Sequence, residues 1–98
     1  MKESHIESYL VRKVKEHGGL CFKFVSPGNP GVPDRIVITP GGKTIYVEFK
    51  TEIGSLAKLQ KWQRREMEKR GSDVSVLFGM DAVKDFLREV FADAVHPA

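Results

Sequence analysis

The chain has 98 residues, of which 41% are hydrophobic and 30% are charged, a balance typical of one compact globular domain and not of a disordered chain. Its 16 Lys and Arg residues against 13 Asp and Glu residues give a net charge of +3, which permits a nucleic-acid partner without requiring one. The single cysteine, Cys21, excludes an internal disulfide and a cysteine-rich zinc site.

The sequence also bears on the cellular location of the protein. The opening stretch MKESHIES is polar, unlike a signal peptide, and no apolar run approaches the roughly 20 residues that span a membrane. The lone cysteine lies in the apolar stretch LCFKFV, as a buried thiol in a reducing compartment would. We expect an intracellular protein without a membrane partner, in the host-cell cytoplasm if the protein is viral.

Hydrophobic periodicity predicts the order αβββαβα. The first helix is indicated by Ile6, Leu10 and Val14, which recur at helical spacing before two glycines. In the second helix, Ser55 is the expected N-cap and Gly71 the expected stop. The predicted helices span residues 4–17, 55–70 and 81–92, and the predicted strands span 20–25, 35–39, 43–50 and 73–78.

The connections between these elements predict the fold class. Pro40-Gly41-Gly42 separates two strands by three residues, which predicts a β-hairpin. A helix connects the third strand to the fourth, so these two strands can pair in parallel. We expect an α/β fold with a mixed central sheet flanked by helices, in one domain of residues 1–98 whose last residues, 93–98, form a frayed tail.

The hairpin brings two carboxylates together after the rigid loop SPGNPGVP. If Thr39 pairs with Lys43, the same register places Asp34 directly opposite Glu48, where like charges destabilise a sheet. Lys50 lies two residues beyond Glu48 and points to the same face. A hard cation such as Mg²⁺ would convert the repulsion between the acids into coordination. The alternative is an ordinary ion pair between Lys50 and one of the acids at a strand end.

Two polar residues lie on predicted apolar helix faces. Glu7 lies between Leu10 and Val14, where a carboxylate needs a partner. It also matches a capping box with Ser4, and the two roles can coexist. Gln60 lies on the apolar face of the second helix, either as a satisfied core amide or as a group that orients a metal ligand, a water or a phosphate. The other residues predicted for that face are Leu56, Leu59, Gln63 and Met67.

The opposite side of the second helix is basic. It carries Lys58, Lys61, Arg64, Arg65 and Lys69. Such a run is usually a solvated surface, but this concentration of positive charge also suits contacts with DNA phosphates. Trp62 borders the basic side and is expected either to stack on a base or to be partly buried against the sheet.

The spacing of these polar residues resembles a nuclease signature. Gly31-Val32-Pro33-Asp34, then Glu48-Phe49-Lys50, then a helix with Gln60, resembles the PD-(D/E)xK nuclease superfamily. The wider frame from about Glu7 to Phe78, with GG, VEFK and LAKLQ, resembles the VRR-NUC branch, the virus-type replication–repair nucleases. The resemblance implies a restriction-endonuclease-like αβββαβ core, here followed by a C-terminal helix.

The resemblance also implies roles for the residues at the matching positions. These are Asp34, Glu48, Lys50, Glu7 and Gln60. The two facing acids and the backbone carbonyl of Phe49 would bind a catalytic Mg²⁺ or Mn²⁺, and the helix glutamate would complete the site directly or through water. The lysine would position or help to deprotonate the attacking water, and the glutamine would support the site. The implied reaction hydrolyses a phosphodiester bond and leaves 5′-phosphate and 3′-hydroxyl ends.

The expected partner is branched DNA. Stand-alone VRR-NUC proteins of viral type resemble Holliday-junction resolvases that act as homodimers, so we expect a structure-selective endonuclease that cuts four-way junctions as a dimer. The dimer interface would use the first helix or Phe86, Val90 and Phe91 of the last helix, unless these residues are plain core. Lys23, Ser26 and Arg35 flank the rigid loop, as phosphate contacts or as ordinary surface polar residues.

Three alternative functions remain open from the sequence. One is a less selective nuclease that cuts flaps, nicks or single strands. Another is a non-catalytic nucleic-acid-binding module on the same scaffold, although intact Asp34, Glu48 and Lys50 argue against it. The last is a small structural subunit whose acids form only surface ion pairs. Divalent-metal binding, seen as a rise in thermal stability, would distinguish a nuclease from such a subunit.

Overall fold

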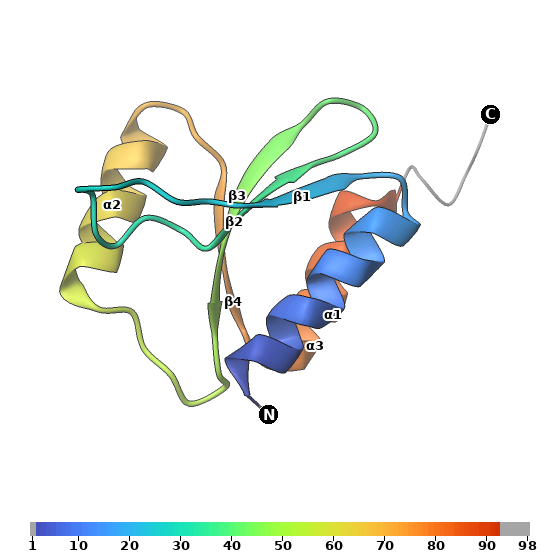
Figure 1. Cartoon of the computed structure of the whole chain (residues 1–98), viewed down its shortest axis with the longest axis horizontal. Helices are drawn as coiled ribbons and strands as arrows, with labels where there is room; N and C mark the ends of the chain where they lie inside the picture. Colours follow the sequence, from blue (N-terminus) through green and yellow to red (C-terminus); the bar gives the residue numbers. More distant parts are fainter. Residues whose placement is uncertain (1, 93–98) are drawn as a thin grey trace.

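The computed structural model describes residues 2–92, and the tail predicted over 93–98 lies outside them. The order αβββαβα is confirmed (Figure 1). The helices are α1 (Glu3–Glu16), α2 (Lys58–Lys69) and α3 (Gly79–Val90), and the strands are β1 (Leu20–Lys23), β2 (Arg35–Ile38), β3 (Thr44–Lys50) and β4 (Val74–Phe78). Within the described residues, each helix is too short or too polar to cross a membrane.

The four strands form one mixed sheet in the order β1-β2-β3-β4. β1 pairs with β2, and β2 with β3, in antiparallel orientation. β3 and β4 are parallel because α2 carries the chain back between them. Ile38 pairs with Thr44, and the Thr39 amide donates to the Lys43 carbonyl at 2.9 Å. The predicted hairpin register is therefore confirmed.

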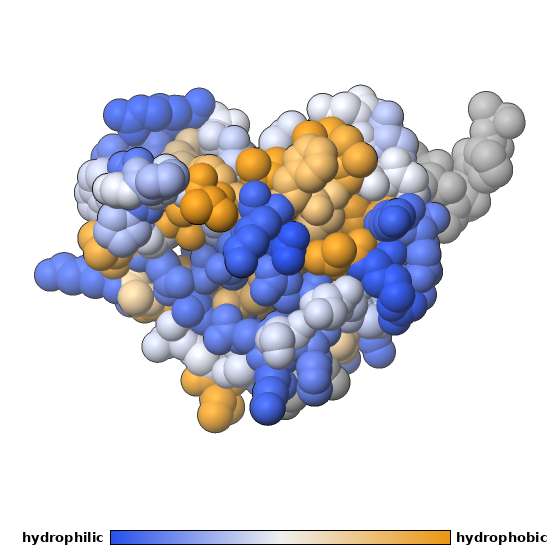
Figure 2. All heavy atoms as spheres, viewed as in Figure 1, coloured by the Kyte–Doolittle hydropathy of each residue, from blue (hydrophilic) through white to orange (hydrophobic). Residues whose placement is uncertain are grey.

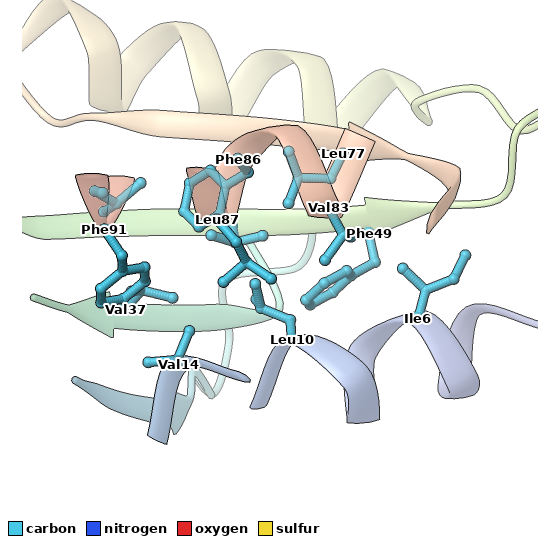
Figure 3. Close-up of a cluster of buried hydrophobic side chains, with 12 residues drawn as sticks. Ile6, Leu10, Val14, Val37, Phe49, Leu77, Val83, Phe86, Leu87 and Phe91 are labelled. Atoms are coloured by element: carbon cyan, nitrogen blue, oxygen red, sulfur yellow. The ribbon is translucent and has the colours of Figure 1, made fainter. Parts of the chain in front are cut away.

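One face of the sheet forms the hydrophobic core with α1 and α3. Alternate residues of β3 point to this face, and the core side chains come from both helices and from β2, β3 and β4 (Figure 3). The fully buried members include Leu10, Val37, Val47, Phe49 and Val83. Burying each such side chain contributes about 1.5–3 kcal/mol, so this face supplies most of the folding stability.

The opposite face is covered only in part, by α2. None of the residues of α2 is buried, and Leu59 and Trp62 are 52% and 49% exposed. The predicted apolar side is half-buried at Leu56, Gln60, Gln63 and Met67 but exposed at Leu59, so it is confirmed only in part. Figure 1 shows α2 separated from α1 and α3, on the other side of the strands.

Both predicted N-caps are wrong. α1 begins at Glu3 with no side-chain cap, so Ser4 lies inside the first turn and forms no capping box with Glu7. α2 begins at Lys58, three residues after Ser55, and the side-chain Oε1 of Gln60 accepts a hydrogen bond from the Ala57 amide at 2.8 Å. Glu7 pairs with Arg35 and not with the Ser4 backbone, and at the start of α2 the local contact comes from Gln60 and not from Ser55.

The last helix belongs to the core. Phe86 and Phe91 are buried, and Val90 packs against the same cluster. The plain-core alternative is therefore confirmed for these side chains. Cys21 is half-buried on the core face of β1, and burial raises the pKa of its thiol, as expected for an unreactive cysteine.

Candidate active site

The hairpin register brings Asp34 to the backbone of β3. The Asp34 amide donates to the Val47 carbonyl at 2.9 Å, and its side-chain Oδ2 accepts from the Phe49 amide at 2.8 Å. Asp34 is thus held through its backbone and through its carboxylate beside Glu48, which lies between those two β3 residues. The predicted convergence of two acids at this end of the hairpin is present in the structure.

Glu48 is a buried carboxylate, with only 4% of the residue exposed. It is on the face opposite the core, because Val47 and Phe49 on either side of it point toward α1 and α3. Gln60 of α2 donates to its Oε2 through Nε2 at 2.8 Å, and Lys50 Nζ lies 3.9 Å from the same oxygen. The three groups converge as the sequence spacing predicts.

The acids perturb each other's protonation. Burial, followed by the charge of Asp34, raises the pKa of Glu48 to about 8 against the smaller opposing effect of Lys50. Burial also raises the pKa of Asp34, against its hydrogen bond from the Phe49 amide. At neutral pH the pair therefore retains a proton, and a bound cation would take the place of that proton.

The proline–glycine loop is fitted closely to α2. Gly31 has φ +90°, and a Cβ at this position would lie 2.7 Å from the Leu59 carbonyl carbon, so only glycine allows the approach. Gln63 Nε2 donates to the Pro30 carbonyl at 3.2 Å. These contacts fix the start of α2 beside the loop, and with it the amide of Gln60 that bonds Glu48.

Glu7 reaches the site from α1 through an ion pair. Arg35 Nε lies 2.6 Å from Glu7 Oε2, and both side chains are largely screened from solvent. The arginine directly follows Asp34, and the charge of Glu7 contributes to raising the pKa of Asp34. Glu7 is therefore paired with Arg35 and acts on the acid pair through its charge on Asp34.

Comparisons with known proteins agree with this geometry. No protein-family model matches the sequence. The chain is 41% identical over 81 residues to a curated protein described as "Putative nuclease p44" of Acyrthosiphon pisum secondary endosymbiont phage 1, covering 83% of this chain and 87% of that protein. A solved structure described as "VRR_NUC domain" matches with a TM-score of 0.82 and 29% identity, covering 88% of this chain and 94% of the other.

The chain belongs to the VRR-NUC family. The family resemblance inferred from the motifs is thus confirmed, and so is the expected α/β fold. Asp34, Glu48, Lys50 and Gln60, which the motif predicts for the site, are brought into contact or close approach by the structure.

The donor set of the VRR-NUC site suits a hard cation. Within residues 2–92, no three His, Cys, Asp or Glu side chains are arranged to hold a metal by themselves. Two carboxylates, Asp34 and Glu48, are available, and Phe49, whose carbonyl the family resemblance adds to the donor set, directly follows Glu48 on β3. Mg²⁺ commonly binds through one or two carboxylates and keeps several waters, so this oxygen-only set fits Mg²⁺ or Mn²⁺.

The residues expected to contact DNA differ in their exposure and in their hydrogen-bond or ion-pair partners. Lys58, Lys61 and Arg65 are exposed on α2, whereas Arg64 Nε lies 3.3 Å from Glu68. Ser26 Oγ accepts from Asn29 Nδ2 at 3.0 Å within the loop, and Lys23 is exposed opposite Arg35 on β1. Because Arg35 is paired with Glu7 of α1, its guanidinium is less available to bind a DNA phosphate than the three exposed cations on α2.

Sequence reasoning missed two contributors to the site. Glu3, in the first turn of α1, adds its charge to the causes that raise the pKa of Glu48. The partnership between Arg35 and Glu7 was also missed. One signal was present: Glu3 and Glu7 are four residues apart and therefore lie on the same side of a helix.

Proposed function

We propose that this VRR-NUC protein is a divalent-metal-dependent DNA endonuclease. The observation that carries the proposal is the contact set around Glu48: a second carboxylate, a lysine and a glutamine amide converge on a carboxylate that is almost fully buried. Such a desolvated acid pair destabilises a fold unless a bound ligand neutralises its charge. A cation that binds phosphate oxygens is the ligand that suits two carboxylates.

The residues of the chain have separate tasks in this proposal. Asp34 and Glu48 hold the cation, and Gln60 fixes the Glu48 carboxylate through the bond to Oε2. Lys50 is close enough to position a water and to offset negative charge at the scissile phosphate. A bound divalent cation would supply charge neutralisation and a lower pKa for the attacking water.

The proposed substrate is branched DNA, cut by a homodimer. A two-fold dimer would present two acid pairs to the symmetry-related strands of a four-way junction. Exposed Lys58, Lys61 and Arg65 on α2 offer positive charge on the side of the molecule that carries Gln60. The dimer would have to use a surface other than Phe86 and Phe91, because these side chains are in the core.

The test is cleavage of labelled four-way junction, flap, nicked and linear duplex DNA with Mg²⁺, Mn²⁺ or EDTA. Lys50→Ala serves as the catalytic variant, and Lys15→Ala, which removes an exposed lysine in the last turn of α1, serves as its control. We expect paired symmetric cuts in the junction that are lost with EDTA and with Lys50→Ala and are retained with Lys15→Ala.

The other outcomes separate the parts of the proposal. Cutting mainly at flaps or nicks would keep the metal-dependent nuclease and overturn the junction specificity. Sedimentation as a monomer at working concentrations, with cuts on one strand only, would overturn the dimer. Tight DNA binding without any cleavage in either metal would overturn the enzyme and favour a non-catalytic binding module.

A further inference from the structure

Exposed hydrophobic side chains lie on the face of the sheet that carries the acid pair. The register places Phe22, Ile36 and Tyr46 in one row across β1, β2 and β3, and Leu20 and Ile38 in the next row. Phe22 and Leu20 are 50% and 51% exposed. Figure 2 shows hydrophobic side chains at the surface on both sides of the notch between α2 and the β2–β3 hairpin.

The aromatic row adjoins the acid pair directly. The Phe24 amide donates to the Asp34 carbonyl at 2.9 Å, so Phe24 extends the register of β1 and lies beside Asp34. Its ring is 5.5 Å from the Tyr46 ring, centroid to centroid. Residues two apart on a strand share a face and are about 7 Å apart, so the row that contains Tyr46 begins about 7 Å from Glu48.

The chemistry of this surface suits bases and not phosphates. The two rows contain Phe, Tyr, Leu, Ile and one Thr, and no charged residue. Aromatic side chains stack on nucleobases with little regard to sequence, at about 1–3 kcal/mol per base. A base inside a continuous duplex is already paired and stacked, and its flat face is not accessible to such a surface.

We propose that Phe22, Phe24 and Tyr46 form a stacking platform for the bases of an unpaired DNA strand whose phosphate lies at the acid pair. The proposal rests on the metal-dependent nuclease proposed above but not on its four-way junction: a fully paired junction would not use the platform, whereas branched DNA with unpaired nucleotides at the branch would. It gives the protein a preference for DNA with unpaired nucleotides beside the cut, and no preference for a particular base.

The position of the platform favours DNA over a second copy of the chain as its occupant. A second copy would also cover an apolar surface. However, the neighbouring row of the same face lies about 7 Å from the acid pair, within reach of the nucleotides that flank a phosphate held over Asp34 and Glu48. A protein chain bound on Phe22 and Tyr46 would occupy the space that those nucleotides need.

The test compares Phe22→Ala with Leu20→Ala, both in a Lys50→Ala background that keeps the DNA intact. The two residues share a strand, a face and an exposed fraction, but Leu20 is one row further from the acid pair. Two DNAs differ only in whether the strand beside the cut is unpaired or paired, and each carries 2-aminopurine at that nucleotide. Circular dichroism and thermal melting check that each variant is folded.

We expect Phe22→Ala to weaken binding of the unpaired DNA by about 5- to 150-fold and to abolish the quenching of 2-aminopurine. Binding of the paired DNA should change less than about 2-fold, as should binding of either DNA by Leu20→Ala. Phe22→Tyr keeps an aromatic ring and should restore the wild-type affinity and quenching.

Three results would overturn the platform. One is an equal loss of affinity for the paired and unpaired DNAs, and another is no loss for either. The third is dissociation of a dimer by both Phe22→Ala and Leu20→Ala in sedimentation, which would make this face an interface between copies. If the wild-type protein binds the unpaired DNA with quenching but never cleaves it, the proposed enzymatic function is overturned and the stacking platform is still supported.

Discussion

Glu48 and Phe49 are neighbours in β3 and are almost equally buried, at 4% and 1% exposed, but their surroundings have little in common. Phe49 lies among the apolar side chains of α1, α3 and the sheet. Glu48 lies on the other face, between Asp34, Lys50 and the amide of Gln60. The buried apolar side chains on the first face stabilise the fold. The carboxylates on the second face repel each other.

The difference extends to the helices that cover each face. α1 and α3 each contribute several buried apolar side chains, while α2 contributes none. Substitutions on the two faces should therefore separate stability from chemistry. The core face should respond in unfolding experiments, and the α2 face should respond in metal binding and cleavage.

The largest effect should come from Glu48→Gln. This substitution removes the buried charge and keeps the shape, so cleavage should fall by about 10²- to 10⁴-fold and metal should no longer raise the melting temperature. The metal-free variant should melt at or above the wild-type temperature, because the repulsion with Asp34 is gone. Retained cleavage, or a clear loss of metal-free stability, would show that Glu48 has a structural role.

The neighbouring Phe49→Ala should produce the opposite pattern. Removing a buried ring from the core should lower the free energy of unfolding by about 3–5 kcal/mol, measured by denaturant titration. Leu59→Ala on α2 is the matched substitution on the other face. Because Leu59 is 52% exposed, its loss should cost less than about 1 kcal/mol. Similar costs for the two would contradict the assignment of the core to one face.

The pH dependence of stability should reveal the acid pair in the metal-free protein. Glu48 has a pKa of about 8 when folded, against an ordinary value of 4.5. The folded state therefore binds more protons than the unfolded chain between these values, so the free energy of unfolding should decrease as pH rises from 4.5 to 8. We expect the melting temperature to fall by several degrees over this range, and Glu48→Gln to flatten the profile. A wild-type profile that rises instead would exclude the proton-sharing pair.

A smaller effect should come from Gly31→Ala, where the loop meets α2. The added Cβ would lie 2.7 Å from the Leu59 backbone at a positive φ, so we expect a loss of about 1–3 kcal/mol together with weaker metal binding as Gln60 shifts. Gly28→Ala is the control, because Gly28 also has positive φ but nothing lies within 4 Å of its added Cβ. Both variants share the backbone strain, but only Gly31→Ala should displace α2. Calorimetric metal titration should therefore show weaker binding for Gly31→Ala than for Gly28→Ala.

Much of the active site follows from local features of the sequence. A three-residue turn fixes the pairing of adjacent strands, so Asp34 opposite Glu48 could be counted from Thr39 and Lys43. The period-two pattern then assigns Glu48 and Lys50 to the face opposite the core. The family motif adds Gln60, whose place on the second helix was also predicted.

Other parts depend on how distant elements pack. The sequence alone determined the element order, the hairpin register and the side of the sheet on which the acids lie, because strand pairing across a short turn and side-chain alternation are local. Only the tertiary structure decided that Glu7 pairs with Arg35, that Leu59 and Trp62 of α2 stay about half exposed, and that Gly31 lies against Leu59. These outcomes depend on the relative positions of helices and loops that are far apart in the chain, which no local pattern specifies.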